Sequence, residues 1–105
     1  MRTAATKDFR FVFEIRAPIS NAMSPEYDDG DQAVISTGTT PMSGDHVVAL
    51  IGETLMLRVY RLRSDGAVEL SALNSDAEPF VIDDQHPGSI VGVAVEKRCS
   101  RRRKH

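Results

Sequence analysis

Short apolar runs separated by turn residues constrain the fold of this chain most. Residues 9–15 read Phe-Arg-Phe-Val-Phe-Glu-Ile, and their period of two places one set of side chains on a single strand face: Phe9, Phe11, Phe13 and Ile15. Further apolar runs occupy residues 33–35, 46–51, 54–63, 67–73, 80–82 and 90–95. No window holds a helical period longer than two turns. The spacing predicts a mainly β fold, a compact antiparallel rolled sheet or barrel with little helix.

Gly52-Glu53 predicts the tightest connection between two of these strands. A two-residue break with glycine first is typical of a type II′ hairpin turn. The strand that returns from it carries Leu55, Leu57 and Val59 at a period of two, and we expect these three side chains to face inward.

The length of the chain is suited to one small domain. Its 105 residues have room for one modest core. We expect an N-terminal extension over residues 1–8, a folded domain over 9–96 and a basic tail over 97–105. No apolar run approaches the ~20 residues of a membrane-spanning helix, and residues 1–7 lack the apolar segment of a secretory signal. A single cysteine, Cys99, fits a reducing compartment, so we expect a cytoplasmic protein without membrane contact.

The net charge of −2 hides an asymmetry. All 15 acidic residues lie at or before Glu96, whereas six of the 13 basic residues follow it. The body should therefore repel polyanions. The tail offers a set of cations for contact with nucleic-acid phosphates or an acidic partner: Arg101, Arg102, Arg103 and Lys104. Because no aromatic residue stands there to stack on bases, the alternative is a solvated end that keeps an acidic body in solution.

Residues 20–31 hold the most informative local pattern. Ser20-Asn21-Ala22-Met23-Ser24-Pro25 is followed by Gly30-Asp31 and a strand, and a second pair, Gly44-Asp45, opens the strand at 46–51. In each pair, glycine can take a positive φ and aspartate can bond its own turn backbone. Downstream come Leu57-Arg58-Val59-Tyr60 and, at the last strand, Val91-Gly92-Val93-Ala94-Val95.

In this order, the segments resemble the C-terminal domain of the LexA and phage-repressor family of self-cleaving serine–lysine peptidases. The resemblance covers roughly residues 9–95 and implies the LexA C-terminal-domain fold, which is also signal-peptidase-like. The family places its nucleophile in Gly-Asp-Ser-Met-x-Pro and its catalytic lysine on the strand after the hairpin. Here Ala22 stands at the serine position. Arg58 stands at the lysine position, or by a shift of one residue Val59 or Tyr60 does.

Neither substitution keeps the chemistry. Alanine has no hydroxyl with which to attack, and the base must be an amine that burial makes neutral near neutral pH. Arginine cannot be deprotonated in a protein. The family's scissile Ala-Gly or Cys-Gly dipeptide does not occur here either. We therefore expect an inactive homologue without a cofactor.

A residual self-cleaving peptidase is the alternative, with Ser20 or Ser24 as the nucleophile. These serines flank Ala22 at strand-like spacing. The three lysines of the chain, Lys7, Lys97 and Lys104, all lie away from the central hairpin.

The resemblance also implies a partner. Domains of this family dimerise, partly through the terminal strand region, and we expect the last strand at a sheet edge, where it offers backbone groups for self-association: Ile90, Val91, Val93 and Val95. The hypothesis is a non-catalytic module in transcriptional regulation that forms a homodimer or pairs with a related repressor. Only eight residues precede the first strand, so we expect no helix-turn-helix domain in this sequence. A nucleic-acid accessory protein acting through the tail is the third hypothesis.

Other candidate groups favour simpler interpretations. The histidines His46, His86 and His105 have no ligand spacing among themselves or with Cys99, so we expect no metal site. Asp28, Asp29 and Asp31 are expected to be solvated turn carboxylates. Met23 is expected to be a buried apolar plug. Arg58 either pairs with a turn carboxylate or projects into solvent.

Overall fold

Seven strands and one helical turn make up the computed structural model, which describes residues 8–74 and 76–99. In chain order the elements are β1 (Arg10–Glu14), α1 (Ile19–Ala22), β2 (Gln32–Ser36), β3 (His46–Ile51), β4 (Thr54–Leu62), β5 (Val68–Ser71), β6 (Phe80–Ile82) and β7 (Ser89–Arg98). The predicted mainly β class with little helix is confirmed, and β3 and β6 begin and end at the predicted residues. The tail cations from Arg101 to Lys104 lie outside the described residues.

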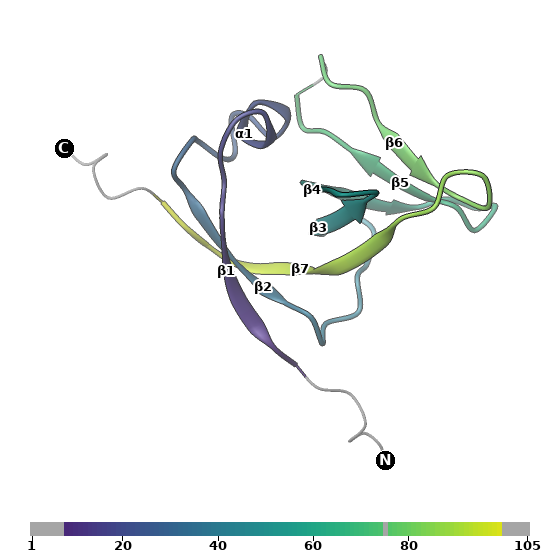
Figure 1. Cartoon of the computed structure of the whole chain (residues 1–105), viewed down its shortest axis with the longest axis horizontal. Helices are drawn as coiled ribbons and strands as arrows, with labels where there is room; N and C mark the ends of the chain where they lie inside the picture. Colours follow the sequence, from purple (N-terminus) through teal and green to yellow (C-terminus); the bar gives the residue numbers. More distant parts are fainter. Residues whose placement is uncertain (1–7, 75, 100–105) are drawn as a thin grey trace.

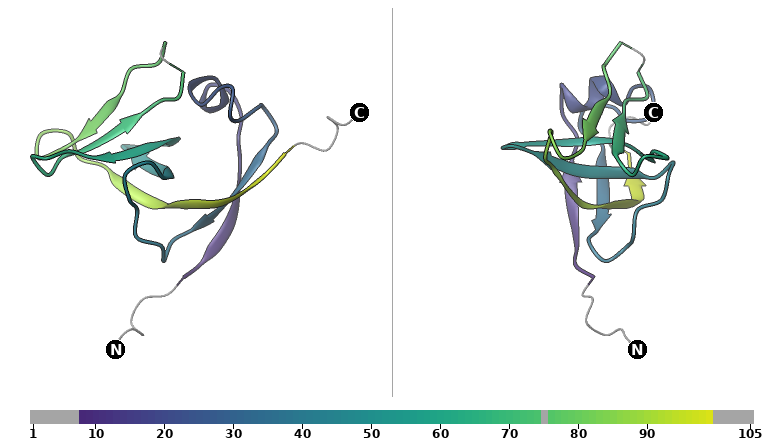
Figure 2. Two further views of the ribbon diagram at one scale, coloured as in Figure 1. Left: turned by 180° about the vertical axis from the view of Figure 1, so that it is seen from behind. Right: turned by 90° about the vertical axis from the view of Figure 1, so that its right-hand side faces the viewer.

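The strands form a single antiparallel sheet in the order β1-β2-β7-β3-β4-β5-β6. The sheet curls into a partial barrel, and α1 lies at its open side (Figure 1). The other two views show that β1 and β2 form one arm and β4, β5 and β6 the other, with β7 running between them (Figure 2). The rolled sheet predicted from the sequence is confirmed.

Strand β7 lies inside the sheet, so its predicted position at a sheet edge is wrong. Its first half, Ser89 to Val93, pairs with β3, and its second half, Val93 to Arg98, pairs with β2. Each ladder has a register shift, and the strand changes partner between them. Ile90, Val91 and Val93 are buried or half-buried in the sheet, and Val95 is 40% exposed.

Gly92 permits this change of partner. A Cβ atom on Gly92 would lie 2.6 Å from Cγ2 of Ile35 and 2.6 Å from the carbonyl oxygen of Ser36. Both distances are far below van der Waals contact, so β2 and β7 approach each other closely only because this position has no side chain.

The β3–β4 hairpin carries a small core on each of its faces. On one face, Val48 and Leu57 pack with residues from the loop between β1 and β2, namely Ile15, Met23 and Tyr27. On the other face, Val47 and Ala49 pack with Leu70 of β5 and Val93 of β7. The middle of β3 is buried on both faces, which explains why Val47, Val48 and Ala49 show no polar alternation.

Apolar side chains become exposed toward the ends of β1 and β4, which corrects the prediction that Leu55 faces inward. Phe13 and Ile15 join the core, but Phe9 and Phe11 on the same face are 64% and 38% exposed because β1 extends beyond the core. Likewise Leu57 and Val59 are buried, whereas Leu55 beside the hairpin turn is 43% exposed. Among the described residues, no helix is long and apolar enough to span a membrane.

Candidate functional site

The loop between β1 and β2 is closed at its base by backbone hydrogen bonds. Ile15 N donates to the carbonyl of Asp31 over 2.8 Å, and Gly30 N donates to the carbonyl of Ile15 over 2.8 Å. Within the loop, Oδ1 of Asp29 accepts a hydrogen bond from Ala17 N at 2.8 Å and a longer one from Ser20 Oγ at 3.4 Å. The loop is therefore a fixed structure that presents α1 at one position over the sheet.

Buried side chains anchor this loop from below. Met23 is fully buried, which confirms its predicted role as an apolar plug. Asp31 is only 1% exposed, and its Oδ2 accepts a hydrogen bond from Asp28 N at 2.9 Å. The prediction of a solvated turn carboxylate is wrong for Asp31, because this side chain caps the turn from the inside.

Tyr27 and Lys97 bind the end of the loop to two strands. The Tyr27 hydroxyl lies 2.8 Å from Nδ1 of His46 at the start of β3. Lys97 of β7 donates from Nζ to the carbonyl oxygen of Glu26 at 2.8 Å, and the same Nζ lies 5.4 Å from the centre of the Tyr27 ring. Burial, with smaller contributions from Glu26 and Asp31, raises the pKa of Tyr27 to about 12. Burial also lowers the pKa of His46.

Ala22, at the end of α1, has a fixed and nearly buried position. Its side chain is 8% exposed, and its carbonyl accepts a hydrogen bond from Asn74 N at 2.9 Å. Nδ2 of Asn74 also donates to the carbonyl of Asn21 at 3.1 Å. The loop after β5 thus holds the end of α1 through two hydrogen bonds from Asn74.

Arg58, in the middle of β4, takes neither of the two predicted arrangements. Its Nη1 donates to the carbonyl of Glu78 at 2.9 Å and lies 3.5 Å from the carbonyl of Leu70. It pairs with backbone oxygens rather than with a turn carboxylate, and it is half-buried rather than directed into solvent. Burial lowers the pKa of Arg58, although guanidinium groups stay charged in proteins.

Ala22 and Arg58 line the same cleft between α1 and β4. One hollow of about 310 Å³ is bordered by Pro18, Asn21, Ala22, Arg58, Asn74, Asp76 and Ala77. A second hollow of about 210 Å³ is bordered by Pro18, Ile19, Ala22, Thr54, Leu55, Met56, Leu57 and Arg58. The two hollows share Pro18, Ala22 and Arg58, so we call them together the α1–β4 cleft. Both hollows expose mostly apolar surface, and the first is also bordered by the polar side chains of Asn21, Asn74 and Asp76.

The two serines proposed as substitute nucleophiles border neither hollow. Ser20 is 5% exposed and its hydroxyl donates to Asp29. Ser24 lies after α1, where its backbone N donates to the carbonyl of Asn21. Within residues 8–74 and 76–99 the lysine is Lys97, and its ammonium group bonds Glu26.

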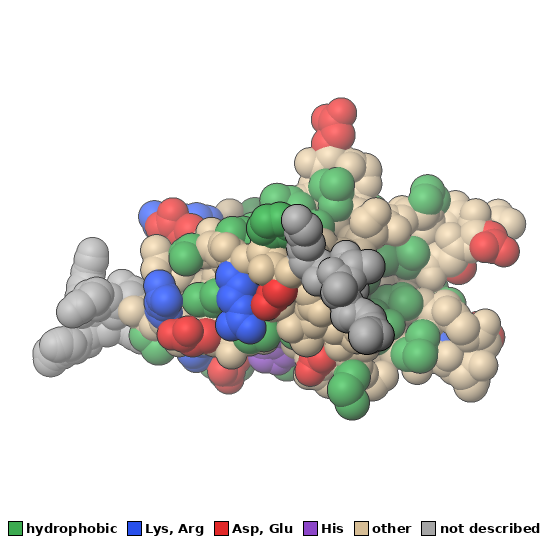
Figure 3. Space-filling view, turned by 90° about the horizontal axis from the view of Figure 1, so that it is seen from below, with side chains coloured by type: hydrophobic (Ala, Val, Ile, Leu, Met, Phe, Trp, Pro, Cys, Tyr) green, Lys and Arg blue, Asp and Glu red, His purple; other side chains and the backbone are tan. Residues whose placement is uncertain are grey.

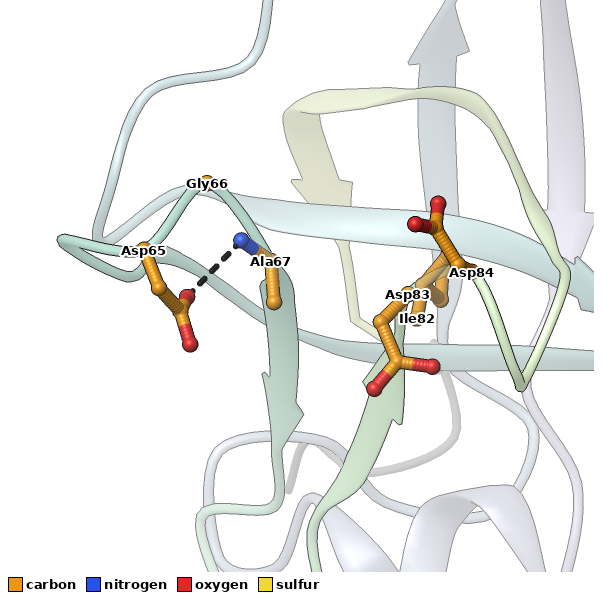
Figure 4. A pocket seen from close by; sticks show the side chains of 6 residues that line it. All are labelled: Asp65, Gly66, Ala67, Ile82, Asp83 and Asp84. Atoms are coloured by element: carbon orange, nitrogen blue, oxygen red, sulfur yellow. Dashed lines mark hydrogen bonds between the residues drawn. The ribbon is translucent and has the colours of Figure 1, made fainter.

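A further hollow, of about 270 Å³, lies between the β4–β5 turn and the end of β6 (Figure 4). Three carboxylates border it, but they do not converge: the Asp83 and Asp84 side chains point in different directions in Figure 4. Oδ1 of Asp65 accepts a hydrogen bond from Ala67 N at 3.0 Å, and Oδ1 of Asp83 accepts one from Gln85 N at 2.9 Å. These carboxylates close turns. In the described part of the chain, no group of three or more His, Cys, Asp or Glu side chains is placed to hold a metal ion.

Several residues of the cleft were not singled out from the sequence as site residues. The period of two predicts a core position for Leu55, and the sequence pattern gives no site role to Pro18 or Met56. Leu55 and Met56 lie beside the predicted hairpin turn. Side chains at such a strand end can extend beyond the core, and this position could have indicated that they border a surface cleft. Asn74 had a weaker signal, a polar residue in the loop that follows β5.

Sequence comparison identifies the class of this domain as peptidase-like. Residues 8–95 match the Peptidase S24-like family, so the chain belongs to this family. It is also similar to the LexA repressor of Desulfatibacillum aliphaticivorans, with 29% identity over 73 residues. That alignment covers 70% of this chain and 36% of the relative, so the chain spans about a third of the length of this curated relative.

Proposed function

We propose that this chain is a non-catalytic S24-like domain that acts as a self-association or partner-binding module linked to transcriptional regulation. One observation carries the proposal. Ala22 and Arg58, which the family resemblance assigns to the nucleophile and base positions, border one cleft, and neither can perform that role. The fold around them is intact, so we assign this domain a role other than bond cleavage.

The hydrogen bonds near the cleft support this proposal. A serine–lysine dyad needs a hydroxyl beside an enclosed neutral amine. The Ser20 hydroxyl instead faces the carboxylate of Asp29, and the Lys97 ammonium faces Glu26.

The cleft also has features that suit a bound segment. Among the described residues, the hydrogen bonds of Arg58 all start at Nη1, and Nε and Nη2 carry further N–H donors. Beside this cation, Ile19, Leu55 and Met56 offer an apolar wall. A partner that combines an apolar side chain with a carboxylate would match both. The link to transcription rests on the similarity to a repressor.

Intact mass spectrometry tests the absence of catalysis. After prolonged incubation at alkaline pH, the wild-type chain should keep its full mass, as should Ser20→Ala and Ser24→Ala. A clipped product that one of these substitutions abolishes would establish a residual peptidase and end the proposal. Sedimentation velocity at rising concentration tests the self-association half.

A further inference from the structure

Strand β1 forms one end of the sheet, and its outer side faces no other strand of the described chain. In the right-hand view of Figure 2, β1 lies outside β2 at the margin of the molecule. Apolar side chains of β1 and of the residue before it are open to solvent: Phe9 is 64%, Phe11 38% and Val12 47% exposed. On the face in Figure 3, hydrophobic side chains reach the surface among acidic and basic ones. An unpaired strand edge with apolar side chains is a template for another strand.

The backbone of β1 divides its hydrogen-bonding groups between two sides. The β1–β2 register extends to Phe9 opposite Thr37, where Thr37 N donates to the Phe9 carbonyl at 2.9 Å. At the other end, Ile15 N donates to the Asp31 carbonyl at 2.8 Å. Odd-numbered residues therefore bond toward β2. By the alternation of an antiparallel ladder, Arg10, Val12 and Glu14 direct their N–H and C=O groups outward.

The outward-bonding residues carry a self-complementary charge pattern. Along residues 8, 10, 12, 14 and 16 the side chains are Asp, Arg, Val, Glu and Arg, and those of Arg10 and Glu14 are 57% and 49% exposed. An antiparallel copy centred on Val12 places Arg10 opposite Glu14 of the partner subunit. It also places Asp8 opposite Arg16 of the partner subunit, although Oδ1 of Asp8 accepts hydrogen bonds from the Ser36 hydroxyl and Gly38 N, so Arg10 and Glu14 are the main charge pair. Every charged residue thus meets the opposite charge, which stabilises cross-strand pairs.

We propose that β1 pairs with β1 of a second copy of this chain, antiparallel and about a twofold axis at Val12. The inference rests on the proposed self-association and assigns it a surface. Arg10, Val12 and Glu14 then each exchange two backbone hydrogen bonds with their opposite residue. A twofold contact of this kind uses the same patch on both subunits and closes at the dimer.

The side chains fit the same register. Phe11 lies opposite Phe13 of the partner subunit, on the face where Phe13 already packs against the core. The pairing therefore covers the exposed Phe11 with an aromatic side chain and extends the core across the axis. Within one chain, Arg10 contacts Asp8 at 3.1 Å and Arg16 contacts Glu14 at 2.6 Å. These are exposed ion pairs of low stability, so they yield readily to the contacts of the dimer.

Charge reversal tests the register. Sedimentation velocity from low to high micromolar concentration should show a dimer for the wild type. Arg10→Glu and Glu14→Arg each place like charges opposite each other at two symmetric sites, which should raise the dissociation constant about tenfold. The double variant restores opposite charges and should return close to the wild-type value. A mixture of the two single variants should form a heterodimer more tightly than either forms its homodimer.

Val95→Glu is the control for the alternative surface on β7, and far-UV circular dichroism verifies that each variant folds. Dissociation by Val95→Glu but not by the β1 reversals would overturn this inference while leaving the proposed self-association intact. Equal weakening by the single and double β1 variants would also overturn it. A wild type that stays monomeric at the highest concentration would refute self-association itself, and the β1 pairing with it.

Discussion

The hydroxyl of Tyr27 lies 2.8 Å from Nδ1 of His46, and the two rings meet edge to face with their centres 5.5 Å apart. This contact joins the loop that carries Ala22 to the first residue of β3. When the His46 ring is neutral with its hydrogen on Nε2, Nδ1 accepts the phenolic hydrogen, and protonation of Nδ1 removes that arrangement.

The first prediction concerns the pH dependence of stability. Burial lowers the pKa of His46 in the folded state; Lys97 acts in the same direction, and Glu26 and Asp45 oppose it. The unfolded chain then binds the proton more readily, so this contribution to stability is present above the unfolded pKa of about 6.5 and is lost as the pH falls through the folded value. His46→Gln should lose less unfolding free energy than the wild type between pH 7.5 and pH 5.5, measured by urea denaturation.

The comparison of the two proteins at pH 8 supplies the control, because His46 is neutral there and only packing differs. If the unfolding free energy of His46→Gln fell between pH 7.5 and pH 5.5 by as much as that of the wild type, the assignment of this pH dependence to His46 would be wrong.

A second prediction compares two methionines. Met23 is fully buried beneath α1, whereas Met42 is 69% exposed. Met23→Ala leaves a cavity in the core and should lower the free energy of unfolding by about 2–5 kcal/mol. Met42→Ala should change it by less than about 0.5 kcal/mol. Equal effects in chemical denaturation would mean that the loop does not depend on its buried anchor.

A third prediction concerns the point where β7 changes partner. Gly92→Ala brings a methyl group against the Ser36 backbone, which cannot rotate away, and should cost about 1–3 kcal/mol or more. In Gly88→Ala the added methyl meets only the side-chain ends of Ile51 and Ile82, which can adjust. Thermal or urea unfolding should therefore show the larger loss for Gly92→Ala, and the reverse order would refute the close approach of β2 and β7.

A fourth prediction tests whether the α1–β4 cleft still provides the environment that an amine base needs. Burial lowers the pKa of Arg58, and the same desolvation should act on a lysine placed there. In Arg58→Lys, the introduced amine should titrate clearly below the ordinary lysine value of about 10.4, as followed by NMR of the side-chain carbon next to it. Arg61→Lys, at an exposed position on the same strand, is the matched control. Identical titration of the two introduced lysines would indicate that the cleft does not desolvate this position.

The local sequence pattern predicts where most of the strands lie in the chain, but it does not predict which strands pair with each other. The bounds of β3 follow from a glycine–aspartate turn before it and a two-residue turn after it, both visible in the sequence. The same pattern cannot say which strands lie beside β7, because pairing depends on contacts distant in sequence. The apolar character of Ile90 to Val95 fits a central strand as well as an edge, and the central position is the one observed.

Only the cleft residues that the family resemblance identifies could be predicted from the sequence. The resemblance named Ala22 and Arg58, and the structure brings both to one cleft. The backbone oxygens that accept hydrogen bonds from Arg58 could not be predicted, because they depend on the conformation of a loop. The burial of Asp31 depends on loop conformation in the same way, and hydrophobic periodicity carries no information about loops. Phe9 and Phe11 have the same spacing as Phe13, and only the extent of the core separates the exposed residues from the buried one.

The double pairing of β7 has a consequence for how the protein is made. β2 and β3 are synthesised early but do not bond each other; each waits for a strand that leaves the ribosome more than fifty residues after β2 begins. Until then the two arms of the sheet are separate pieces with open apolar faces. The native state can therefore form only after synthesis reaches this strand, and earlier intermediates would be natural clients for chaperones.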